Sequence, residues 1–335
     1  MNLGSPLQLI IAPLLSFLAS YLLIFWLAKG NAPKILDIPN TRSLHSTPVP
    51  RTGGIGLLLP TLIIWLLFPV SLPIPLWVGL GLLALVSLAD DVMNLSVLVR
   101  LLVHIIVAMG FSTMLLLDTH GWVVVIGIGM AMIWMCNLYN FMDGSDGLAG
   151  GMTLIGFGYY GVAALLAGNM EFAMVNFCIM ASAGAFLRFN FHPAQVFMGD
   201  VGAIPLGFLA GVLGTLGWTK ELWSLWLPLL VFSPFIVDAT VTLVKRLYRG
   251  ERIWQAHREH YYQRMIQSGF GHRNTALLGY ILMLLAGGSA VWTSKDHFVT
   301  QSWLTVVWGG VYLIIMLAFD WYQHYRFNNK QNDRT

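Results

Sequence analysis

The chain has 335 residues, of which 57% are hydrophobic and only 10% are charged, and its formal net charge is +3. Soluble domains have about one-quarter charged residues, so this composition excludes an ordinary soluble protein and indicates a polytopic membrane protein. Membrane topology and attraction to an anionic leaflet explain the small positive charge, and we expect no nucleic-acid partner.

Apolar segments predict about eleven membrane-spanning helices, because one crossing of the hydrocarbon core requires about 20 mostly apolar residues. The predicted spans are residues 7–28, 54–70, 74–89, 99–117, 121–137, 150–167, 171–187, 202–217, 223–244, 274–292 and 303–320. The first span has no basic residue before it and Lys29 after it, so we expect a retained helix rather than a signal peptide. Together the spans form one membrane-embedded domain, residues 1–322, and the polar tail at 323–335 is expected to be disordered.

The basic residues predict the orientation of the chain, because Lys and Arg accumulate in cytoplasmic loops. If the N-terminus is periplasmic and the C-terminus cytoplasmic, only Lys220 and Lys295 of the 18 basic residues lie outside. The same orientation places every polar motif described below in the cytoplasm, although these motifs were not used to choose it. The sequence therefore predicts a functional site at the cytoplasmic face.

The first cytoplasmic loop, residues 30–53, carries His45 and Arg51. Both are candidate phosphate ligands, and the arginine fork can bind two phosphate oxygens at once. Topology alone would also place basic residues in this loop. Both interpretations remain open.

Asp90 and Asp91 end the third predicted span at the membrane surface. Successive helix residues point about 100° apart, so the two carboxylates cannot form a single bidentate clamp. We expect one to face a metal ion or a reacting phosphate and the other to face a basic partner. The alternative is a solvated helix end, although the C-terminus of a helix disfavours acids.

The segment 137–151 predicts a tight loop followed by a helix, and it carries Asn140, Asp143 and Asp146. Glycines within it permit left-handed backbone conformations, and main-chain amides at the start of the next helix can bind an anion. An EF-hand calcium loop is excluded, because that loop needs oxygen ligands at alternating positions and a glutamate at the twelfth. The acidic loop is therefore a candidate functional site.

The loop between the seventh and eighth predicted spans carries Asn190, Phe197 and Asp200. An amide can hydrogen-bond the edge of a planar ring, an aromatic side chain can stack on that ring, and a carboxylate beside a glycine is accessible to a hard cation. Magnesium is typically held by one or two carboxylates together with substrate phosphate oxygens. The chain supplies such oxygens and lacks the thiolate or multi-histidine set of a zinc site, so magnesium is the expected metal.

The last large cytoplasmic loop, residues 245–273, adds Arg258 and His260 as candidate phosphate ligands. The alternative for this loop is again topological charge without a direct role. Asp238, in the span before the loop, is an intramembrane acid. It has either a functional role or an interhelical hydrogen bond to Ser or Thr.

Taken together and in this order, three motifs resemble those of the polyprenyl-phosphate N-acetylhexosamine-1-phosphate transferases, the MraY/WecA group. They are Asp-Asp, Asn-x-x-Asp-Gly-x-Asp-Gly-Leu-Ala and Pro-Ala-Gln-Val-Phe-Met-Gly-Asp. The resemblance covers nearly the whole chain, and the opening and late loops are most similar to the WbpL-type enzymes that initiate O-antigen synthesis. The triple histidine of the MraY branch is absent, with Tyr262 and Gln263 in that region, which argues against MurNAc-pentapeptide transfer.

The resemblance implies a role for each acidic motif. Asp200 resembles the magnesium ligand and Asp90 the base that deprotonates the lipid phosphate, with Asp91 in support. Asp146, Asn190 and Phe197 are the implied nucleotide contacts, with Phe197 stacked on uracil. Asn140 and Asp143 are implied to lie near the ribose and diphosphate, and Asp143 is counted among the catalytic residues.

The implied reaction transfers HexNAc-1-phosphate from a UDP-HexNAc to undecaprenyl phosphate at the cytoplasmic face of a bacterial inner membrane, and UMP is released. The WbpL-like loops favour a 6-deoxy donor such as FucNAc or QuiNAc, whereas the wider family favours GlcNAc. The implied cofactor is Mg²⁺, with Mn²⁺ as a substitute, and a homodimer is an open alternative to a monomer. The competing functions are MurNAc-pentapeptide transfer and transport of a lipid-linked sugar. A transporter would show polar groups at the membrane midplane and a repeat with broken helices, which we do not find in the sequence.

Overall fold

The computed structural model describes residues 6–29, 36–37, 48–68, 70–93, 95–252, 254–255, 257–294 and 297–332. Its elements are α1 (Pro6–Lys29), β1 (Leu36–Asp37), β2 (Val49–Pro50), α2 (Gly53–Leu67), α3 (Ile74–Met93), α4 (Val97–Met142), α5 (Leu148–Leu166), α6 (Met170–Asn190), α7 (Asp200–Thr219), α8 (Trp226–Val231), α9 (Ser233–Tyr248), α10 (Tyr261–Met265), η1 (Ile266–Phe270), α11 (Gly271–Trp292) and α12 (Phe298–Asn332). Strand structure in these ranges is confined to the short antiparallel pair β1–β2. The predicted all-α polytopic fold is confirmed.

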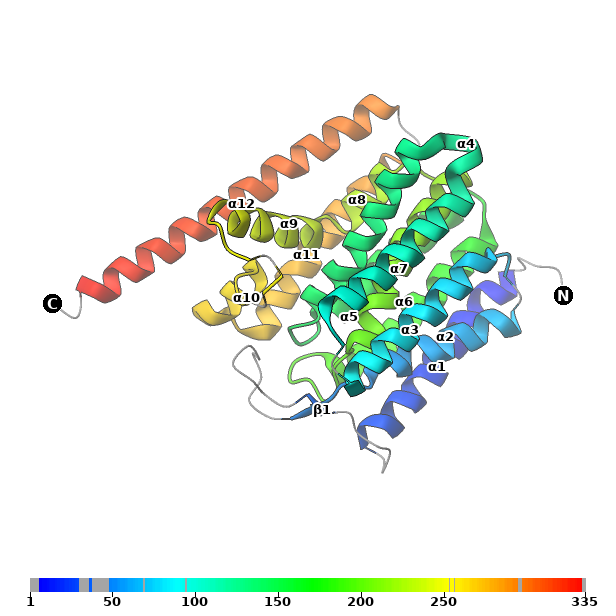
Figure 1. The fold of residues 1–335 in the computed structure, drawn as a ribbon, viewed down its shortest axis with the longest axis horizontal. Helices are drawn as coiled ribbons and strands as arrows, with labels where there is room; N and C mark the ends of the chain where they lie inside the picture. Colours follow the sequence, from blue (N-terminus) through cyan, green and yellow to red (C-terminus); the bar gives the residue numbers. More distant parts are fainter. Residues whose placement is uncertain are drawn as a thin grey trace.

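In the part of the chain that the structure describes, 8 helices are long and apolar enough to cross a membrane. The longest, α4, consists of two helices joined at Gly121, where φ is 73° and ψ is 174°. A positive φ is readily available only to glycine, so the chain can turn back here, as Figure 1 shows at the label α4. The two arms agree with the predicted spans 99–117 and 121–137. The shorter apolar helix α2 has 15 residues.

The ninth predicted span, residues 223–244, is wrong as a single helix. The structure has the 6-residue α8 and the 16-residue α9 in its place, with Phe232 between them. Pro234 lies in the first turn of α9, where a missing amide proton is tolerated but a continuing helix is not. Figure 1 shows α9 at an angle to the helices around it.

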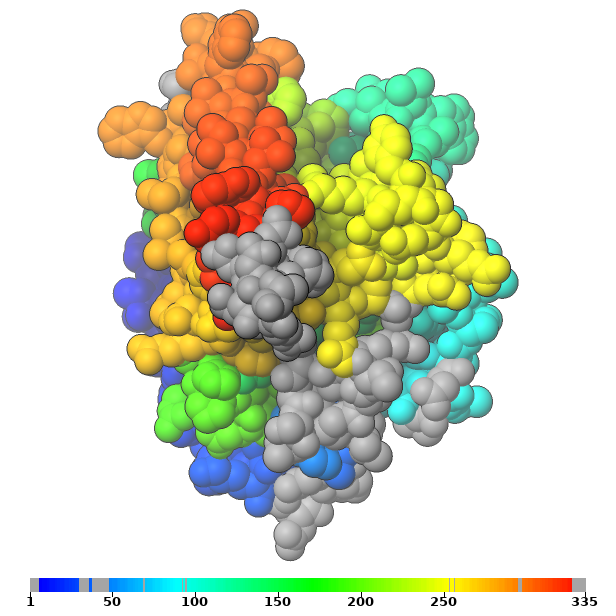
Figure 2. Space-filling model, turned by 90° about the vertical axis from the view of Figure 1, so that its left-hand side faces the viewer, coloured from blue at the N-terminus to red at the C-terminus, as the bar shows by residue number. Residues whose placement is uncertain are grey.

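The end of α12 is also different from the expectation of a disordered tail. The helix continues to Asn332, so the boundary predicted at 322 lies inside it. Gln323 donates a 2.8 Å hydrogen bond to the hydroxyl of Ser268, and Arg326 donates to the carbonyl oxygen of the same residue. Figure 2 shows α12, in orange and red, on the same face as the yellow segment near residue 250.

A close approach of two helices determines the position of the site. Helix α7 lies in the core, and 89% of its most apolar stretch is buried inside the protein. A Cβ atom on Gly54 of α2 would lie 2.3 Å from the Cα atom of Gly202 in α7, so only glycine allows these backbones to meet. The start of α2 and the start of α7 are therefore held side by side.

Candidate functional site

The chain before α2 pairs with the chain before α7. Phe197 donates its main-chain N–H to the carbonyl oxygen of Pro50 at 2.8 Å, and Gly53 donates its own to the carbonyl oxygen of Phe197 at 2.9 Å. Gly199 has a φ of 71°, and a Cβ there would lie 2.6 Å from the carbonyl oxygen of Arg51. Glycine is required here for both reasons, and it brings Arg51 next to the motif that ends at Asp200.

Asp200, the first residue of α7, lies where both ends of α4 meet this motif. Its Oδ1 accepts a 2.7 Å hydrogen bond from Nδ2 of Asn140, near the end of α4. Its Oδ2 lies 3.3 Å from Nη1 of Arg100, in the first turn of α4. A carboxylate is also favoured at the N-terminus of a helix by the helix dipole.

Asp90 and Asp91 face different arginines. Oδ2 of Asp90 accepts from Nη1 of Arg100 at 2.8 Å, so that one guanidinium bridges Asp90 and Asp200. Oδ1 of Asp91 lies 3.8 Å from Nη1 of Arg51, whose Nη2 donates to Asp37 at 2.8 Å. The two carboxylates therefore diverge as expected, but each has a basic partner, where the sequence led us to expect this of one only.

Asp143 connects the end of α4 to the same place. Its Oδ2 accepts the main-chain N–H of Gly199 at 3.0 Å. Loss of solvent is the largest cause that raises the pKa of Asp143 well above its usual range. The hydrogen bond from Gly199 opposes this rise, and the nearby charge of Asp200 adds to it. The protonated form of this carboxyl is therefore favoured more strongly than that of an ordinary aspartate.

Asp146 lies on the other side of this loop, beside two histidines that sequence reasoning did not single out. Its Oδ2 accepts from Nδ1 of His192 at 2.6 Å and from the N–H of Ala194 at 3.2 Å. Nδ1 of His272 lies 3.8 Å from Oδ1 of Asp146, and the rings of His192 and His272 stack with centroids 5.4 Å apart. From the sequence, His192 could have been identified as a site residue only by its position within the 188–200 motif. No sequence feature marks His272.

Asn190 joins the two acidic loops. It is 2% exposed, its Oδ1 accepts the N–H of Gly147 at 3.0 Å, and its Nδ2 donates to the carbonyl oxygen of Val196 at 2.9 Å. Both ends of the amide are thus used inside the protein, so Asn190 positions the loops. The ring of Phe197 is half-buried beside them. A nucleotide contact by Asn190 or Phe197 stays a prediction.

The late loop reaches the site through aromatic contacts. His260 is 3% exposed, and its ring lies 5.7 Å from that of Phe141, while Oη of Tyr262 donates to the carbonyl oxygen of Phe141 at 2.8 Å. Burial is the largest cause that lowers the pKa of His257 to about 4, and the electrostatic effects of the neighbouring His260 and Arg246 lower it further.

Two predicted site residues are not brought into this network by the contacts described. The carbonyl oxygen of Arg258 accepts from Gln267 at 3.1 Å, and no contact described here joins its guanidinium to the acidic residues. His45 lies outside the described residues. Arg100 is the main addition, because sequence reasoning counted it only as topological charge.

The oxygens of this network fit magnesium by their chemistry. The described ranges contain no cluster of three or more His, Cys, Asp and Glu side chains that could hold a metal ion. Magnesium does not need such a cluster, because it is commonly held by one or two carboxylates and by substrate phosphates. Asp90 and Asp200 supply converging carboxylates, and their joint negative charge is balanced here only in part, by Arg100.

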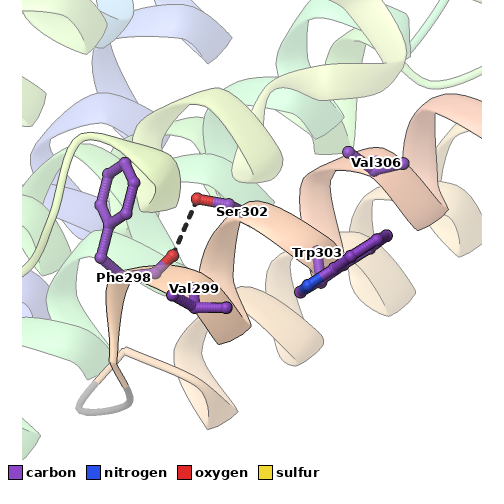
Figure 3. A pocket seen from close by; sticks show the side chains of 5 residues that line it. All are labelled: Phe298, Val299, Ser302, Trp303 and Val306. Carbon is purple, nitrogen blue, oxygen red and sulfur yellow. Dashed lines mark hydrogen bonds between the residues drawn. The ribbon is translucent and has the colours of Figure 1, made fainter.

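The hollow drawn in Figure 3 is a different place. It is lined by Phe298, Val299, Ser302, Trp303 and Val306, all from α12. Its polar side-chain groups are the hydroxyl of Ser302, which donates to the carbonyl oxygen of Phe298 at 2.8 Å, and the indole N–H of Trp303. This largely apolar hollow has no charged residue to bind a phosphate or a cation, so we place the functional site at the acidic network.

Most of the acidic network lies in the part of the chain that matches a known family. The family model for "Glycosyl transferase family 4" matches residues 74–217, which include Asp90, Asp143 and Asp200. A probable undecaprenyl-phosphate N-acetylglucosaminyl 1-phosphate transferase of Bacillus subtilis (strain 168) is 28% identical over 330 residues, covering 93% of this chain and 89% of that protein.

Two further relatives carry related names. The undecaprenyl-phosphate alpha-N-acetylglucosaminyl 1-phosphate transferase of Yersinia pestis is 27% identical over 292 residues, covering 78% of each chain. The decaprenyl-phosphate N-acetylglucosaminephosphotransferase of Mycobacterium leprae (strain TN) is 27% identical over 312 residues, covering 78% of this chain and 77% of that one. Fold, site and matches define a multi-pass membrane protein of the phosphoglycosyltransferase class. The matched family model and the names of the relatives support the family that the motifs resemble, the polyprenyl-phosphate N-acetylhexosamine-1-phosphate transferases.

Proposed function

We propose that this protein transfers HexNAc-1-phosphate from a UDP-HexNAc to undecaprenyl phosphate and releases UMP. The observation that carries the proposal is the bridge that Arg100 makes between Asp90 and Asp200, within the segment that the family model matches. The names of the relatives supply the chemistry, since each is described as a transferase of N-acetylglucosamine phosphate to a polyprenyl phosphate.

In the proposed reaction an oxygen of the lipid phosphate attacks the phosphorus that carries the sugar. A new P–O bond forms there, the P–O bond to the uridine-bearing phosphate breaks, and UMP leaves with that electron pair. Phosphoryl transfer depends mostly on positioning and on electrostatic stabilisation, so two polyanions must be held together against their repulsion. Arg100 and Arg51 are the fixed positive groups that the acidic network holds in place for this.

Asp90 accepts the proton of the lipid phosphate in this proposal and orients the attacking oxygen. A phosphate monoester has a second pKa near 6, so at pH 7 it is already mostly dianionic and orientation is the larger part of the role. Asp91 keeps Arg51 in place, and Asp143 holds the chain at Gly199. Direct attack is favoured over an aspartyl-phosphate because no carboxylate in the network is set apart as a nucleophile.

Asp200 is the residue that would hold Mg²⁺ together with phosphate oxygens of the substrate, with Mn²⁺ as a substitute. When bound, the ion supplies charge neutralisation at the diphosphate. The amide of Asn140 fixes Oδ1 of Asp200, so the direction of this carboxylate is determined before any ligand arrives. Phe197 and Asp146 are the proposed nucleotide contacts, and His260 and Arg258 stay candidate phosphate ligands of the late loop.

For the donor sugar we propose a 6-deoxy-HexNAc such as QuiNAc or FucNAc, and hence initiation of O-antigen synthesis. The support is the WbpL-like late loop, in which Tyr261 and Tyr262 are 6% and 4% exposed. An apolar pocket at the sugar C6 would discriminate between donors by only about 10–200-fold. The relatives named for N-acetylglucosamine make UDP-GlcNAc the competing donor.

We also propose that the site faces the cytoplasm of a bacterial inner membrane, with the N-terminus in the periplasm. The support is the distribution of Lys and Arg, of which only Lys220 and Lys295 lie outside in this orientation. Single cysteines introduced at Lys220 and at Arg249 should be labelled from opposite sides by a membrane-impermeant thiol reagent in intact cells. Labelling of Arg249→Cys but not Lys220→Cys from outside would reverse the orientation.

The reaction is tested by UMP release from the purified chain with undecaprenyl phosphate and Mg²⁺. UDP-GlcNAc, UDP-QuiNAc and UDP-FucNAc are compared in one assay, and the matched controls omit the lipid phosphate or use Asp200→Asn. Lipid-dependent UMP release supports the proposal, and a clear preference for UDP-GlcNAc contradicts only the 6-deoxy donor. Absence of UMP release with every donor contradicts the transferase.

A further inference from the structure

Asp238, in the middle of α9, contacts the main chain of the late loop. The residue is 8% exposed, its Oδ1 accepts the N–H of Tyr261 at 2.8 Å, and its Oδ2 accepts the N–H of Tyr262 at 2.9 Å. The hydroxyl of Thr242, one helical turn further along α9, donates to Oδ1 at 3.3 Å. The sequence left open a functional role or an interhelical hydrogen bond to Ser or Thr. The structure instead shows Asp238 bonded mainly to main-chain N–H groups of the late loop.

The carboxylate of Asp238 satisfies the first two main-chain N–H groups of α10, beside the capping box that His260 and Gln263 form there. The first N–H groups of a helix have no partner within the helix, and a carboxylate that accepts them makes charge-assisted bonds. Because Asp238 belongs to α9 rather than to the loop, these bonds also fix the loop relative to α9. An asparagine has one acceptor oxygen and would turn its NH₂ group toward the other N–H, so it cannot replace both bonds.

The fixed start of α10 continues to the acidic network through Tyr262. Oη of Tyr262 donates to the carbonyl oxygen of Phe141 at 2.8 Å, and the ring of His260 stacks on that of Phe141. A Cβ atom on Gly144 would lie 2.4 Å from Oη of Tyr262, so glycine leaves the room that this contact needs. Phe141 and Gly144 flank Asp143, which bonds Gly199 next to Asp200.

We propose that Asp238 is a positioning residue: by accepting the N–H groups of Tyr261 and Tyr262, it holds the late loop against the turn that carries Asp143. Its effect on turnover rests on the proposed function, whereas the contact between α9 and α10 does not. The second acid near α10, Asp320, has hydrogen bonds to side chains, at 2.9 Å to Tyr261 Oη, 2.6 Å to Arg264 Nη2 and 2.6 Å to Lys245 Nζ of α9. Asp238 alone of these two acids holds the main chain.

The test uses the purified full chain in detergent and three variants. Asp238→Ala removes both acceptors, Asp238→Asn keeps the volume if the alanine variant fails to fold, and Thr242→Val removes only the neighbouring hydroxyl. Hydrogen exchange is measured for peptides that cover residues 257–265, with peptides from α5 as the internal reference. We expect faster exchange at the amides of both Tyr261 and Tyr262 in Asp238→Ala, at one or both of them in Asp238→Asn, and no change in Thr242→Val.

The kinetic readout is kcat and KM for the UDP-sugar. A misplacement of about 1 Å can reduce a rate 10²-fold, so we expect kcat of the Asp238 variants to fall by about 10–100-fold and Thr242→Val to stay within about twofold. Unchanged exchange at Tyr261 and Tyr262, or lost protection with parental kcat and KM, would overturn the proposal. A parent chain that releases no UMP contradicts the proposed function instead, and the exchange result alone then supports or overturns the contact.

Discussion

The amide of Asn140 and the carboxylate of Asp200, 60 residues apart in the chain, are joined by a hydrogen bond of 2.7 Å. Asn140 lies near the end of α4 and Asp200 begins α7, so this bond connects two of the motifs that the sequence presents separately. The geometry makes Asn140 a residue that orients the carboxylate of Asp200. Variants of the two residues should therefore separate the binding of the cation by Asp200 from the orientation of that carboxylate by Asn140.

We therefore expect Asp200→Asn to abolish turnover and Asn140→Ala to reduce it. Loss of a metal contact typically removes several kcal/mol of transition-state stabilisation, so the first change should lower kcat by at least about 10³-fold. Asn140→Ala keeps the carboxylate and should lower kcat by about 10-fold, with more Mg²⁺ needed for half-maximal rate. UMP release measured against Mg²⁺ concentration checks both, and Asp200→Asn with a near-parental rate at ordinary Mg²⁺ would remove Asp200 from the metal site.

Arg100 should be as important as the carboxylates that it bridges. Arg100→Ala leaves Asp90 and Asp200 without their shared guanidinium, and we expect a loss of about 100-fold or more in kcat. Arg100→Lys keeps the charge but not the fork, so its rate should lie between those of the parent and the alanine variant. The control is Arg249→Ala, which removes a half-exposed arginine from ion pairs at the surface and should change the rate less than twofold. Equal rates for the two alanine variants would leave Arg100 with a topological role only.

Asp143 should make stability depend on pH in the opposite sense to an ordinary ion-paired aspartate. Its pKa is raised in the folded state, so above the ordinary value of 3.8 the folded chain binds more protons than the unfolded chain. The contribution of Asp143 to stability is therefore present at low pH and is lost as the pH rises toward its folded pKa. We expect Asp143→Asn to melt at a higher temperature than the parent at pH 7 without Mg²⁺, although it is inactive.

The difference in melting temperature between parent and Asp143→Asn should shrink as the pH falls from 7 to 5. Thermal unfolding in detergent measures it, with Asp118→Asn, in the turn of α4 just before Gly121, as the matched control. A difference that stayed constant over this range would mean that Asp143 is ionised in the folded chain throughout.

The acids of the site could be predicted from the sequence because an acid at the end of an apolar span is conspicuous. Arg100 could not, since a basic residue at a cytoplasmic helix end is what topology alone produces. The break between α8 and α9 was missed because the average hydropathy of a 22-residue window conceals the effect of Pro234. The contacts of Asp238 and of His272 join residues that are not neighbours in the chain, so no local sequence pattern predicts them.

Phe197→Ala should weaken the binding of UDP-sugars and of tunicamycin-like nucleosides together. Stacking of a base on an aromatic ring is worth about 1–3 kcal/mol, so Kd for UDP should rise by about 5–150-fold. The matched control is Phe298→Ala on α12, a Phe→Ala change at an exposed position far from the acidic network. Calorimetric titration with UDP checks this, and parental affinity in Phe197→Ala would place the uracil elsewhere.

Asn190 either positions the two acidic loops or contacts the nucleotide directly. Measuring the stability of a variant without ligand distinguishes these two roles. Asn190→Asp keeps the oxygen that accepts from Gly147 but replaces the donor that faces the carbonyl oxygen of Val196 with a second acceptor. A buried polar group left without its partner costs about 1–3 kcal/mol, so the variant should unfold at a lower temperature than the parent before any substrate is added. The comparison variant is Asn176→Asp, whose amide also donates inside the protein but lies in α6 away from the loops. We expect both variants to lose stability and only Asn190→Asp to lose affinity for UDP. If Asn190→Asp instead kept the parental melting temperature and bound UDP more weakly, Asn190 would be a direct nucleotide contact and not a positioning residue.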